Sequence, residues 1–549
     1  MSWSDRGPLV GLLLGLVLVA CAAAAWRAPV PAMRSDHAMP APALDTDKPA
    51  LAGDVPQGLT LHCTTDGSEP GPGSMRWDGA PLGPDEALAQ RRIRVSTSPQ
   101  WRAPVPGDQA GGVAARARYC TDDGRCGPVV QRTWPIMRYG LPVLSLVLPD
   151  GAFLDPDTGI YVVGHAIFRD GETAVQRYPR DQKWWKYPGN YQFRGEAWER
   201  SAGLEVFEAD GARVWAGTTQ VRINGNNTRG FPQHALRLSF DAPMPVRLFG
   251  PGEGSGHRRL VLRAGGNDQD RAFLRDALQH RLCTGMPFMT SAYRPCVLLV
   301  NGTYWGLHDL RERMDDREVA RRIGAARKDI TILADRAILY DGDERQVARF
   351  TRLLARAEKW DAALPAFVDS LEHHLDLDGF LQYMAAQIIL GNADWPDQNV
   401  KYWRYTGRPD TVPGPRDGRW RFIMGDSDQG FGHPAPVDAD HFAHVLGKTT
   451  PVPRLFKACL RSEAVRERFR GIVLAQLDGP LASDRMEAMV DRLAAAIAPE
   501  MPRQVRRWRR PASVPAWERE VEALRWFARQ RGAHVRRQLN DHFPSRSAA

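Results

Sequence analysis

An aspartate and an asparagine five positions apart, Asp394 and Asn399, stand in a polar loop that follows an apolar helical pattern over residues 377–390. In phosphoryl transfer, an aspartate in such a loop accepts or orients the hydroxyl proton of the acceptor. The asparagine oxygen a few residues later ligates a divalent metal. A polar loop that only caps the end of the helix is the alternative, because this spacing also occurs by chance.

Two further carboxylates, Asp426 and Asp428, follow an apolar strand pattern at residues 419–424. Alternate residues of a strand point to the same side, so the two carboxylates are expected side by side. Like charges at that separation repel unless a proton or a cation lies between them, and Mg²⁺ and Mn²⁺ prefer oxygen ligands. The pair therefore predicts a Mg²⁺ or Mn²⁺ site, and an Asx-turn before Gly430 and Gly432 is the alternative.

A third polar stretch, residues 222–230, is a Gly/Asn-rich turn between two strand patterns. Backbone N–H groups around Gly225 and Asn226, together with the Arg229 guanidinium, have the chemistry to bind phosphate groups. A plain hairpin loop is the alternative interpretation.

Strands and helices must together position these polar segments. Alternating strand patterns at residues 56–138 predict a small fibronectin/Ig-like β-sandwich. From residue 140 to residue 549, strand patterns come first and helical periods follow beyond Arg311. Strands first and helices later predict an α+β, bilobal body with a helical C-terminal part.

The N-terminus reads as an export signal. Arg6 precedes an uncharged apolar run over residues 9–26, and the four residues that end in Cys21 resemble a bacterial lipobox. We therefore expect a signal in residues 1–21, a lipid on Cys21 that holds the protein to a membrane, and a flexible tether over residues 22–55. An exported, cell-envelope lipoprotein follows, and Ala22 favours the outer membrane. Inner-membrane anchoring and plain secretion are the alternatives.

Six cysteines lie beyond Cys21, which in an exported chain indicates disulfide bonds. Cys120 and Cys126 flank a turn sequence and are the favoured pair, followed by Cys283 and Cys296. The spacings of metal-binding cysteines are missing from the sequence, so a cysteine metal site is not expected.

Composition excludes some classes. The 549 residues are 43% hydrophobic and 25% charged, which is ordinary for a globular protein and excludes wholesale disorder, collagen and coiled coil. The net charge of +9 is small for a chain of this length, so no nucleic-acid partner is expected.

Several motifs occur in the order seen in one family. They are Gly159–Tyr161, Val206–Gly211, Arg222–Arg229, Leu262–Asp268, Arg275-Asp276, Asn301–Gly306 with Arg311-Glu312, Gly391–Trp395 and Gly425–Asp428. Together they resemble the CotH-like (spore coat protein H) atypical protein kinases over about residues 142–456. In addition, Thr64–Pro70 resembles the signature of the chitobiase/β-hexosaminidase C-terminal module, an accessory β-sandwich.

The resemblance implies a kinase-like fold that uses ATP and Mg²⁺ or Mn²⁺ to phosphorylate serine on a protein. Combined with the export signal, this places the expected protein substrate in the cell envelope or outside the cell. It implies that Asp394 is the catalytic-loop aspartate, that Asn399, Asp426 and Asp428 bind metal, and that Glu312 is an ion-pair partner. The residues expected on the phosphate side are Arg222, Asn226, Arg229, His234, Arg237 and Arg263.

One position departs from the family pattern. His234 stands where the family carries a lysine, and a neutral histidine lacks the fixed charge of a phosphate-binding lysine. Arg222, Arg229, Arg237 and Arg263 are candidate replacements. The alternative to an active kinase is a non-catalytic surface or adhesion lipoprotein built on a kinase-like scaffold.

Overall fold

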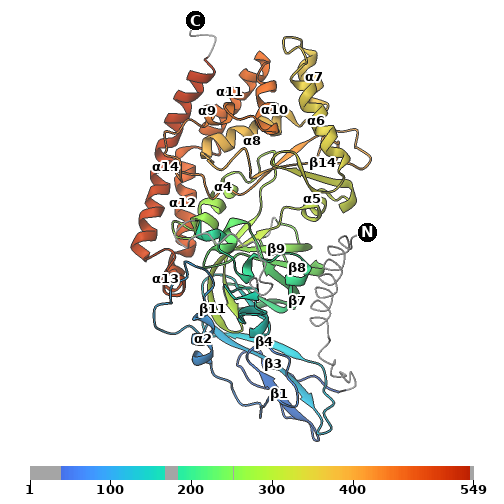
Figure 1. Ribbon diagram of the computed structural model, residues 1–549, viewed down its shortest axis with the longest axis vertical. Coiled ribbons are helices and arrows are strands. Elements are labelled where there is room, and N and C mark those ends of the chain that lie inside the picture. The colour runs from blue at the N-terminus through green and yellow to red at the C-terminus, as the bar shows by residue number, and fades with distance from the viewer. Residues whose placement is uncertain (1–38, 167–182, 251–252, 545–549) are drawn as a thin grey trace, which may run out of the picture.

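A computed structural model describes residues 39–166, 183–250 and 253–544. Three parts follow one another along the longest axis: an N-terminal sheet, a β-barrel, and a second lobe with a small sheet and most of the helices (Figure 1). The α+β class expected from the sequence is confirmed. Cys21 and the expected signal lie outside the described residues.

The N-terminal part is one antiparallel sheet, not the two stacked sheets of a sandwich. Its strand order is β2-β1-β3-β4, and helix α2 lies between β2 and β3 in the chain. The bounds are β1 Thr60–Thr64, β2 Met75–Arg76, α2 Glu86–Ile93, β3 Gly112–Cys120 and β4 Val130–Pro135. The alternating patterns predicted strands correctly, but alternation does not tell how many sheets the strands form.

Residues 43–55, expected in the tether, pack on this sheet. Leu44, Leu51 and Val55 contact its apolar cluster, and the indole Nε1 of Trp134 donates a hydrogen bond to the Asp45 carbonyl oxygen at 3.0 Å. The expected tether is therefore too long at its C-terminal end.

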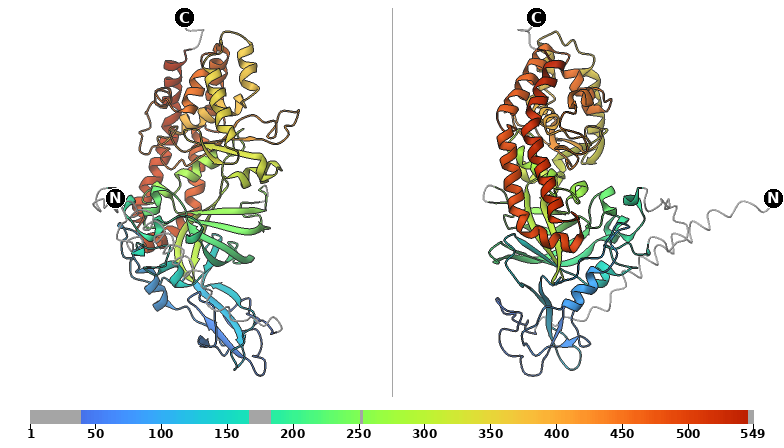
Figure 2. Two further views of the ribbon diagram at one scale, coloured as in Figure 1. Left: turned by 45° about the vertical axis from the view of Figure 1, so that its right-hand side comes forward. Right: turned by 90° about the vertical axis from the view of Figure 1, so that its left-hand side faces the viewer.

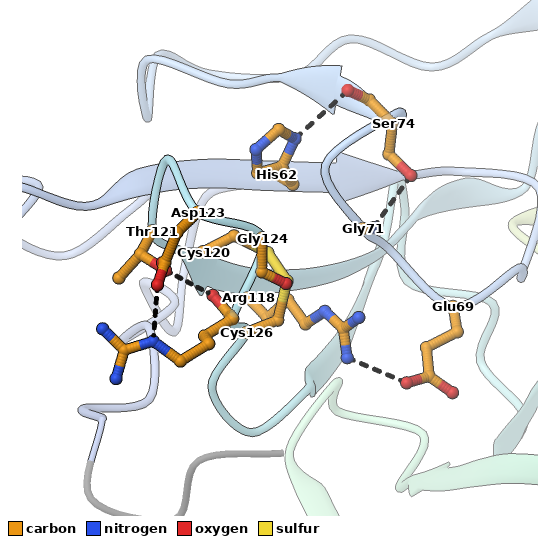
Figure 3. The surroundings of a disulfide bond; sticks show 11 residues. His62, Glu69, Gly71, Ser74, Arg118, Cys120, Thr121, Asp123, Gly124 and Cys126 are labelled. Carbon is orange, nitrogen blue, oxygen red and sulfur yellow. Dashed lines mark hydrogen bonds and ion pairs between the residues drawn. A yellow bond between two sulfur atoms is a disulfide. The ribbon is translucent and has the colours of Figure 1, made fainter. Parts of the chain in front are cut away.

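The cysteine expectations have opposite outcomes. Cys120 and Cys126 form a disulfide across the turn after β3 (Figure 3). The thiols of Cys283 and Cys296 are both free and buried, so the second expected bridge is wrong. Cys296 lies in the apolar cluster inside the barrel and Cys283 in the cluster of the helical lobe, so the two sulfurs belong to different cores.

The barrel closes in the order β10-β11-β9-β8-β7-β6-β5, with β10 and β5 paired in parallel. Its strands are β5 Val143–Val147, β6 Arg200–Phe207, β7 Arg213–Ile223, β8 Leu236–Met244, β9 His257–Arg263, β10 Tyr293–Val300 and β11 Thr303–Glu312. Alternate residues of these strands, such as Leu236, Leu238, Leu260 and Leu262, fill the interior. Helix α3, Asp150–Leu154, follows β5, and helix α4, Arg275–Leu282, lies between β9 and β10 in the chain.

The second lobe contains a four-stranded sheet of order β13-β12-β14-β15. Its strands are β12 Ile330–Ala334, β13 Ile338–Asp341, β14 Val400–Tyr405 and β15 Arg421–Met424. The helices before β14 are α5 Asp316–Ile323, α6 Arg345–Ala357, α7 Ala366–Glu372 and α8 Leu377–Leu390. Helix α8 is buried almost throughout, because its sequence is apolar on every face.

The C-terminal helices connect the lobes. They are α9 His441–Leu446, α10 Pro451–Cys459, α11 Glu463–Asp478, α12 Ser483–Ile497, α13 Met501–Trp508 and α14 Val514–His542. Helices α12 and α14 pack together along one side of the molecule, and α13 reaches β11 of the barrel (Figure 2). Among the described residues, no helix is both long enough and apolar enough to cross a membrane.

A candidate active site between the two lobes

Three segments that are distant in sequence meet at the boundary of the barrel and the second lobe. Helix α8 ends at Leu390, and the left-handed conformation of the next residue, Gly391, turns the chain into the loop that carries Asp394. Strands β14 and β15 are antiparallel neighbours with Val400 opposite Met424. This register places Asn399, just before β14, beside the residues that follow β15.

Asp394 and Asn399 are in direct contact. Asn399 has a positive φ of 61°, and its amide nitrogen donates to Asp394 Oδ2 at 2.9 Å. Gln429 donates to the same oxygen at 3.2 Å, and Gln398 donates to Oδ1. Burial raises the pKa of Asp394 although the bonds from Gln398 and Asn399 oppose the shift. The amide oxygen of Asn399 remains as a ligand atom.

Asp426 and Asp428 are held together by one guanidinium. The Nη2 of Arg263 donates to Asp426 Oδ1 at 2.7 Å and to Asp428 Oδ2 at 2.5 Å. Asn267 adds a backbone and a side-chain hydrogen bond to Asp428 at 2.8 and 2.9 Å. The Asp428 side chain is 3% exposed and that of Asp426 is 34% exposed. Asp426 is therefore the carboxylate that a ligand meets.

Burial and neighbouring charges act together on Asp428. Burial, together with the neighbouring Asp426 carboxylate, raises the pKa of Asp428. Despite its burial, Arg263 has a pKa well above its usual value because Asp276, Asp426 and Asp428 surround it. Arg263 thus stays cationic in the cleft.

Two residues that the sequence analysis did not assign to the site position this group. Gly266 has a φ of 58°, and a Cβ at this residue would overlap the Asp428 carboxylate and the Arg263 guanidinium. Asp276 of α4 accepts from Arg311 Nη1 at 2.6 Å and from the Ser427 backbone N–H at 3.0 Å. Although burial opposes the shift, Arg263 and Arg311 hold the pKa of Asp276 below its usual range. An Arg-Asp pair at a helix start was the only sequence signal for Asp276.

Two cavities meet at these side chains. One of about 330 Å³ lies against β9, β11, β14 and the end of β15, and one of about 260 Å³ lies against the turn at residues 224–228 and the loop at Asp394. Both are lined by Asn224, Arg263, Asn399 and Asp426. A larger hollow of about 750 Å³ lies elsewhere, between the N-terminal sheet, α2 and α3.

His234 and Arg229, both expected on the phosphate side, are structural. His234 is fully buried, with its ring centroid 4.4 Å from that of Tyr161 and 5.0 Å from that of Tyr191. Arg229 donates to the backbone carbonyls of four residues, Gly225, Tyr191, Phe193 and Ile223. Neither residue lines the two cavities, so the expectation for both is wrong.

The remaining phosphate-side expectations are divided. Arg222 and Arg237 are cross-strand partners on β7 and β8 that share the Glu199 carboxylate at 3.2 and 2.6 Å, and neither lines the cavities. Asn226 lines the 260 Å³ cavity, and Arg263 lines both. Of the expected cations, Arg263 is therefore the one that the fold places in the cleft.

Glu312 forms ion pairs, but with helix α5. Arg321 donates to Glu312 Oε1 at 3.1 Å, and Arg322 pairs with Oε2. Ligand atoms of His257, Glu312 and Glu318 lie within 4.8 Å of one another, close enough to hold a metal ion. Arg321 and Arg322 also bind Glu318, so the two carboxylates already face two cations.

The arrangement offers oxygen ligands for a divalent cation, a guanidinium for a phosphoryl group, and in Asp394 a carboxylate able to accept a proton. Comparison with protein families gives a match to the family described as CotH kinase protein over residues 221–535, more than half of the chain. The match includes the strands and loops that carry Asp394, Asn399, Asp426 and Arg263. Among curated proteins, none matches the chain significantly.

Proposed function

Because the chain belongs to the CotH kinase family, we propose that it is a metal-dependent kinase that transfers the γ-phosphoryl group of ATP to a serine hydroxyl of a protein. The observation that carries the proposal is that Asp394, Asn399 and Asp426 line two neighbouring cavities that share Arg263. Positioning and charge stabilisation are what a protein supplies to phosphoryl transfer.

The donor set suits Mg²⁺ or Mn²⁺. Asp426 offers a partly exposed carboxylate, and Asn399 offers its amide oxygen because its nitrogen is bonded to Asp394. Both are hard oxygen ligands. A bound cation supplies charge stabilisation on the phosphoryl oxygens. Asp428, buried and bonded by Asn267, orients Asp426 through Arg263.

The 330 Å³ cavity suits the nucleoside. Val261 from the barrel and Val400 and Met424 from the second lobe give it apolar walls on both sides. Lys401 lines the same cavity, where its ammonium donates to the Met314 carbonyl oxygen at 3.0 Å. The phosphates then extend toward Arg263 and the second cavity.

Arg263 is proposed to supply the positive charge at the phosphates that was expected from a lysine. It is the half-buried cation that both cavities share, and its guanidinium has donors for carboxylate and phosphate oxygens at once. The histidine at position 234 therefore does not remove the cation from the site. This argument favours an active kinase over a binding scaffold that has lost its phosphate-binding cation.

Asp394 is proposed to receive the acceptor. Its carboxylate lines the 260 Å³ cavity, and its raised pKa makes it a better proton acceptor than an exposed aspartate. The serine oxygen attacks the γ-phosphorus, its proton passes to Asp394, and the bond from the γ-phosphorus to the leaving oxygen of ADP breaks. Asn399 and Gln429 hold the carboxylate in place.

We also propose the setting that the N-terminal sequence predicts: export, a lipid on Cys21, and a protein substrate in the envelope or outside the cell. Mass spectrometry of the mature protein tests the lipid. An unmodified Cys21 would remove the anchor and leave the kinase proposal standing.

A non-catalytic binding scaffold is the second candidate. The observation that favours it is Arg263 itself, which spans Asp426 and Asp428 where a cation would bind. On this hypothesis the guanidinium permanently replaces the metal, and the cleft binds no metal–nucleotide complex.

Thermal unfolding with ATP and Mg²⁺ or Mn²⁺ separates the two candidates. A ligand present at 100 times its Kd stabilises the folded state by about 2.7 kcal/mol. We expect a higher Tm for the wild type, no shift for Asp426→Asn, and a wild-type shift for the control Asp410→Asn, which alters an exposed carboxylate paired with Arg416. Absence of a shift in the wild type with either metal would support the scaffold.

A further inference from the structure

A second, arginine-rich hollow of about 210 Å³ lies beside α5, outside the cleft. Its walls come from β9, the residue before α5, α5 itself and the loop that follows. It is lined by five arginines: Arg258, Arg259, Arg317, Arg321 and Arg327. Two carboxylates, Asp315 and Glu318, complete its charged lining.

Both carboxylates are already engaged. Asp315 Oδ2 pairs with Arg259 at 3.0 Å and with Arg313 at 3.4 Å, while its Oδ1 accepts the backbone N–H groups at the start of α5. Glu318 pairs with Arg321 and Arg322 and contacts His257. Neither has an oxygen to spare for a further arginine.

The other arginines lack an equivalent partner in the hollow. The Nε of Arg317 is buried without a hydrogen-bond partner. Arg258 donates to a neutral group, the Asp241 carbonyl oxygen, and Arg327 pairs with Asp316 outside the lining. Burial, with Arg327 and Arg259 nearby, lowers the pKa of Arg317. Guanidinium groups held this close favour a multivalent anion between them.

We propose that this hollow binds a phosphate monoester, the phosphorylated serine or threonine side chain of a protein. A phosphomonoester carries nearly two charges and three acceptor oxygens, which fit guanidinium donors from several sides. The volume suits one phosphoryl group with its side chain. The apolar residues of the lining are Gly256, Ala320 and Ala325, too small to hold a lipid chain.

The hollow is close to the cleft. Arg313, which shares Asp315 with Arg259, also lines the 330 Å³ cavity. A chain bound by its phosphate here is therefore held next to the site of transfer. The hollow would dock a substrate that already carries one phosphate, or a phosphorylated copy of this chain. This role rests on the proposed function, whereas the anion site does not.

Fluorescence anisotropy tests the site with a labelled Gly-Ala-phosphoserine-Ala-Gly peptide and its serine counterpart, without metal or nucleotide. We expect the phosphopeptide to bind at least tenfold tighter than the serine peptide. Arg317→Ala should weaken it about tenfold, and Arg317→Lys should weaken it less. Arg345→Ala, which alters an arginine that is 89% exposed and paired only locally, should bind as the wild type does.

Asp426→Asn should also bind the phosphopeptide with wild-type affinity. A loss of ligand binding in the cleft can then be distinguished from a loss of phosphopeptide binding in the hollow. Equal binding of both peptides, or a phosphopeptide affinity unchanged in Arg317→Ala with wild-type Tm, would overturn the proposal. Displacement by inorganic phosphate at the same concentration as the peptide, or tighter binding to phosphoinositide vesicles, would overturn the assignment to a protein side chain.

Discussion

At Gly266 the missing side chain allows the Asn267 backbone N–H and Arg263 to converge on Asp428. Gly266→Ala should destabilise the protein by about 1–3 kcal/mol, because it adds a Cβ at positive φ and displaces the carboxylate. Urea unfolding measures the change. Gly471→Ala is the matched control: it lies in α11 with open space around it and should stabilise by about 0.5–1 kcal/mol. Equal effects at the two glycines would contradict the packing described here.

His234 should make the fold sensitive to acid. Burial first, and then the Arg229 charge, lower its pKa to about 3, and the ring also contacts Tyr161 and Tyr191. Its ordinary pKa is about 6.5, so below that pH the unfolded chain binds a proton that the folded chain does not. The contribution of neutral His234 to the free energy of unfolding is fully present above pH 6.5 and is lost as the pH falls toward 3.

Replacement by phenylalanine isolates this effect. From pH 7.5 to pH 5, the wild type should lose about 2 kcal/mol more stability than His234→Phe, in denaturant titrations at both pH values. A parallel loss in both proteins would show that the imidazole titrates normally. The buried setting also decides what a lysine would do at this position: His234→Lys should lower stability, because it buries an amine, and should not improve nucleotide binding.

Residue types predicted which carboxylates and amide line the cleft better than they predicted the positions of the expected phosphate-side residues. Asp394 and Asn399 lie in contact, and the β14–β15 register places Asn399 beside Asp426 at the end of β15. The expectation that Arg229 and His234 lie on the phosphate side was wrong for a physical reason. An arginine in a Gly/Asn-rich turn satisfies backbone carbonyls as readily as phosphates, and the sequence does not tell which it faces.

At the scale of elements, Arg229 holds the turn after β7. Its guanidinium bonds carbonyls on both sides of the chain, at Gly225 and Ile223 and at Tyr191 and Phe193. Arg229→Ala should cost about 2–4 kcal/mol, since these buried acceptors lose a charged donor.

The check is thermal unfolding beside Arg194→Ala, an exposed arginine with one side-chain partner at 3.1 Å. The control should stay within about 0.5 kcal/mol of the wild type. If Arg229→Ala left the stability almost unchanged but weakened nucleotide binding, Arg229 would have a role in phosphate binding instead.

Helices were predicted closely where their apolar period was long. The helix expected at residues 377–390 is α8, Leu377–Leu390. Sheet topology was not predictable in this way. The barrel depends on pairing between distant strands, such as β5 with β10, and local pattern carries no information on such partners.

At the scale of the whole molecule, Arg92 joins the N-terminal sheet to the barrel. This buried arginine donates to both Asp150 oxygens at 2.8 and 2.9 Å and to the carbonyl oxygens of Asn301 and Thr65. Arg92→Ala should cost about 2–4 kcal/mol and separate the unfolding of the sheet from that of the barrel.

Calorimetry would detect the second transition. Arg91→Ala changes the adjacent exposed arginine of α2 and should leave a single transition. A single wild-type-like transition in Arg92→Ala would mean that other contacts join the two parts.

The central claim is that the cleft transfers phosphate. The direct measurement incubates the purified protein with γ-³²P-labelled ATP and Mg²⁺ or Mn²⁺, and follows label on serine of the chain itself or of a serine-rich protein. We predict transfer by the wild type and by Asp410→Asn, and a loss of about 10²–10⁴-fold in Asp394→Asn. Transfer by Asp394→Asn at the wild-type rate, or no transfer by a wild type that binds the metal–ATP complex, would contradict the account.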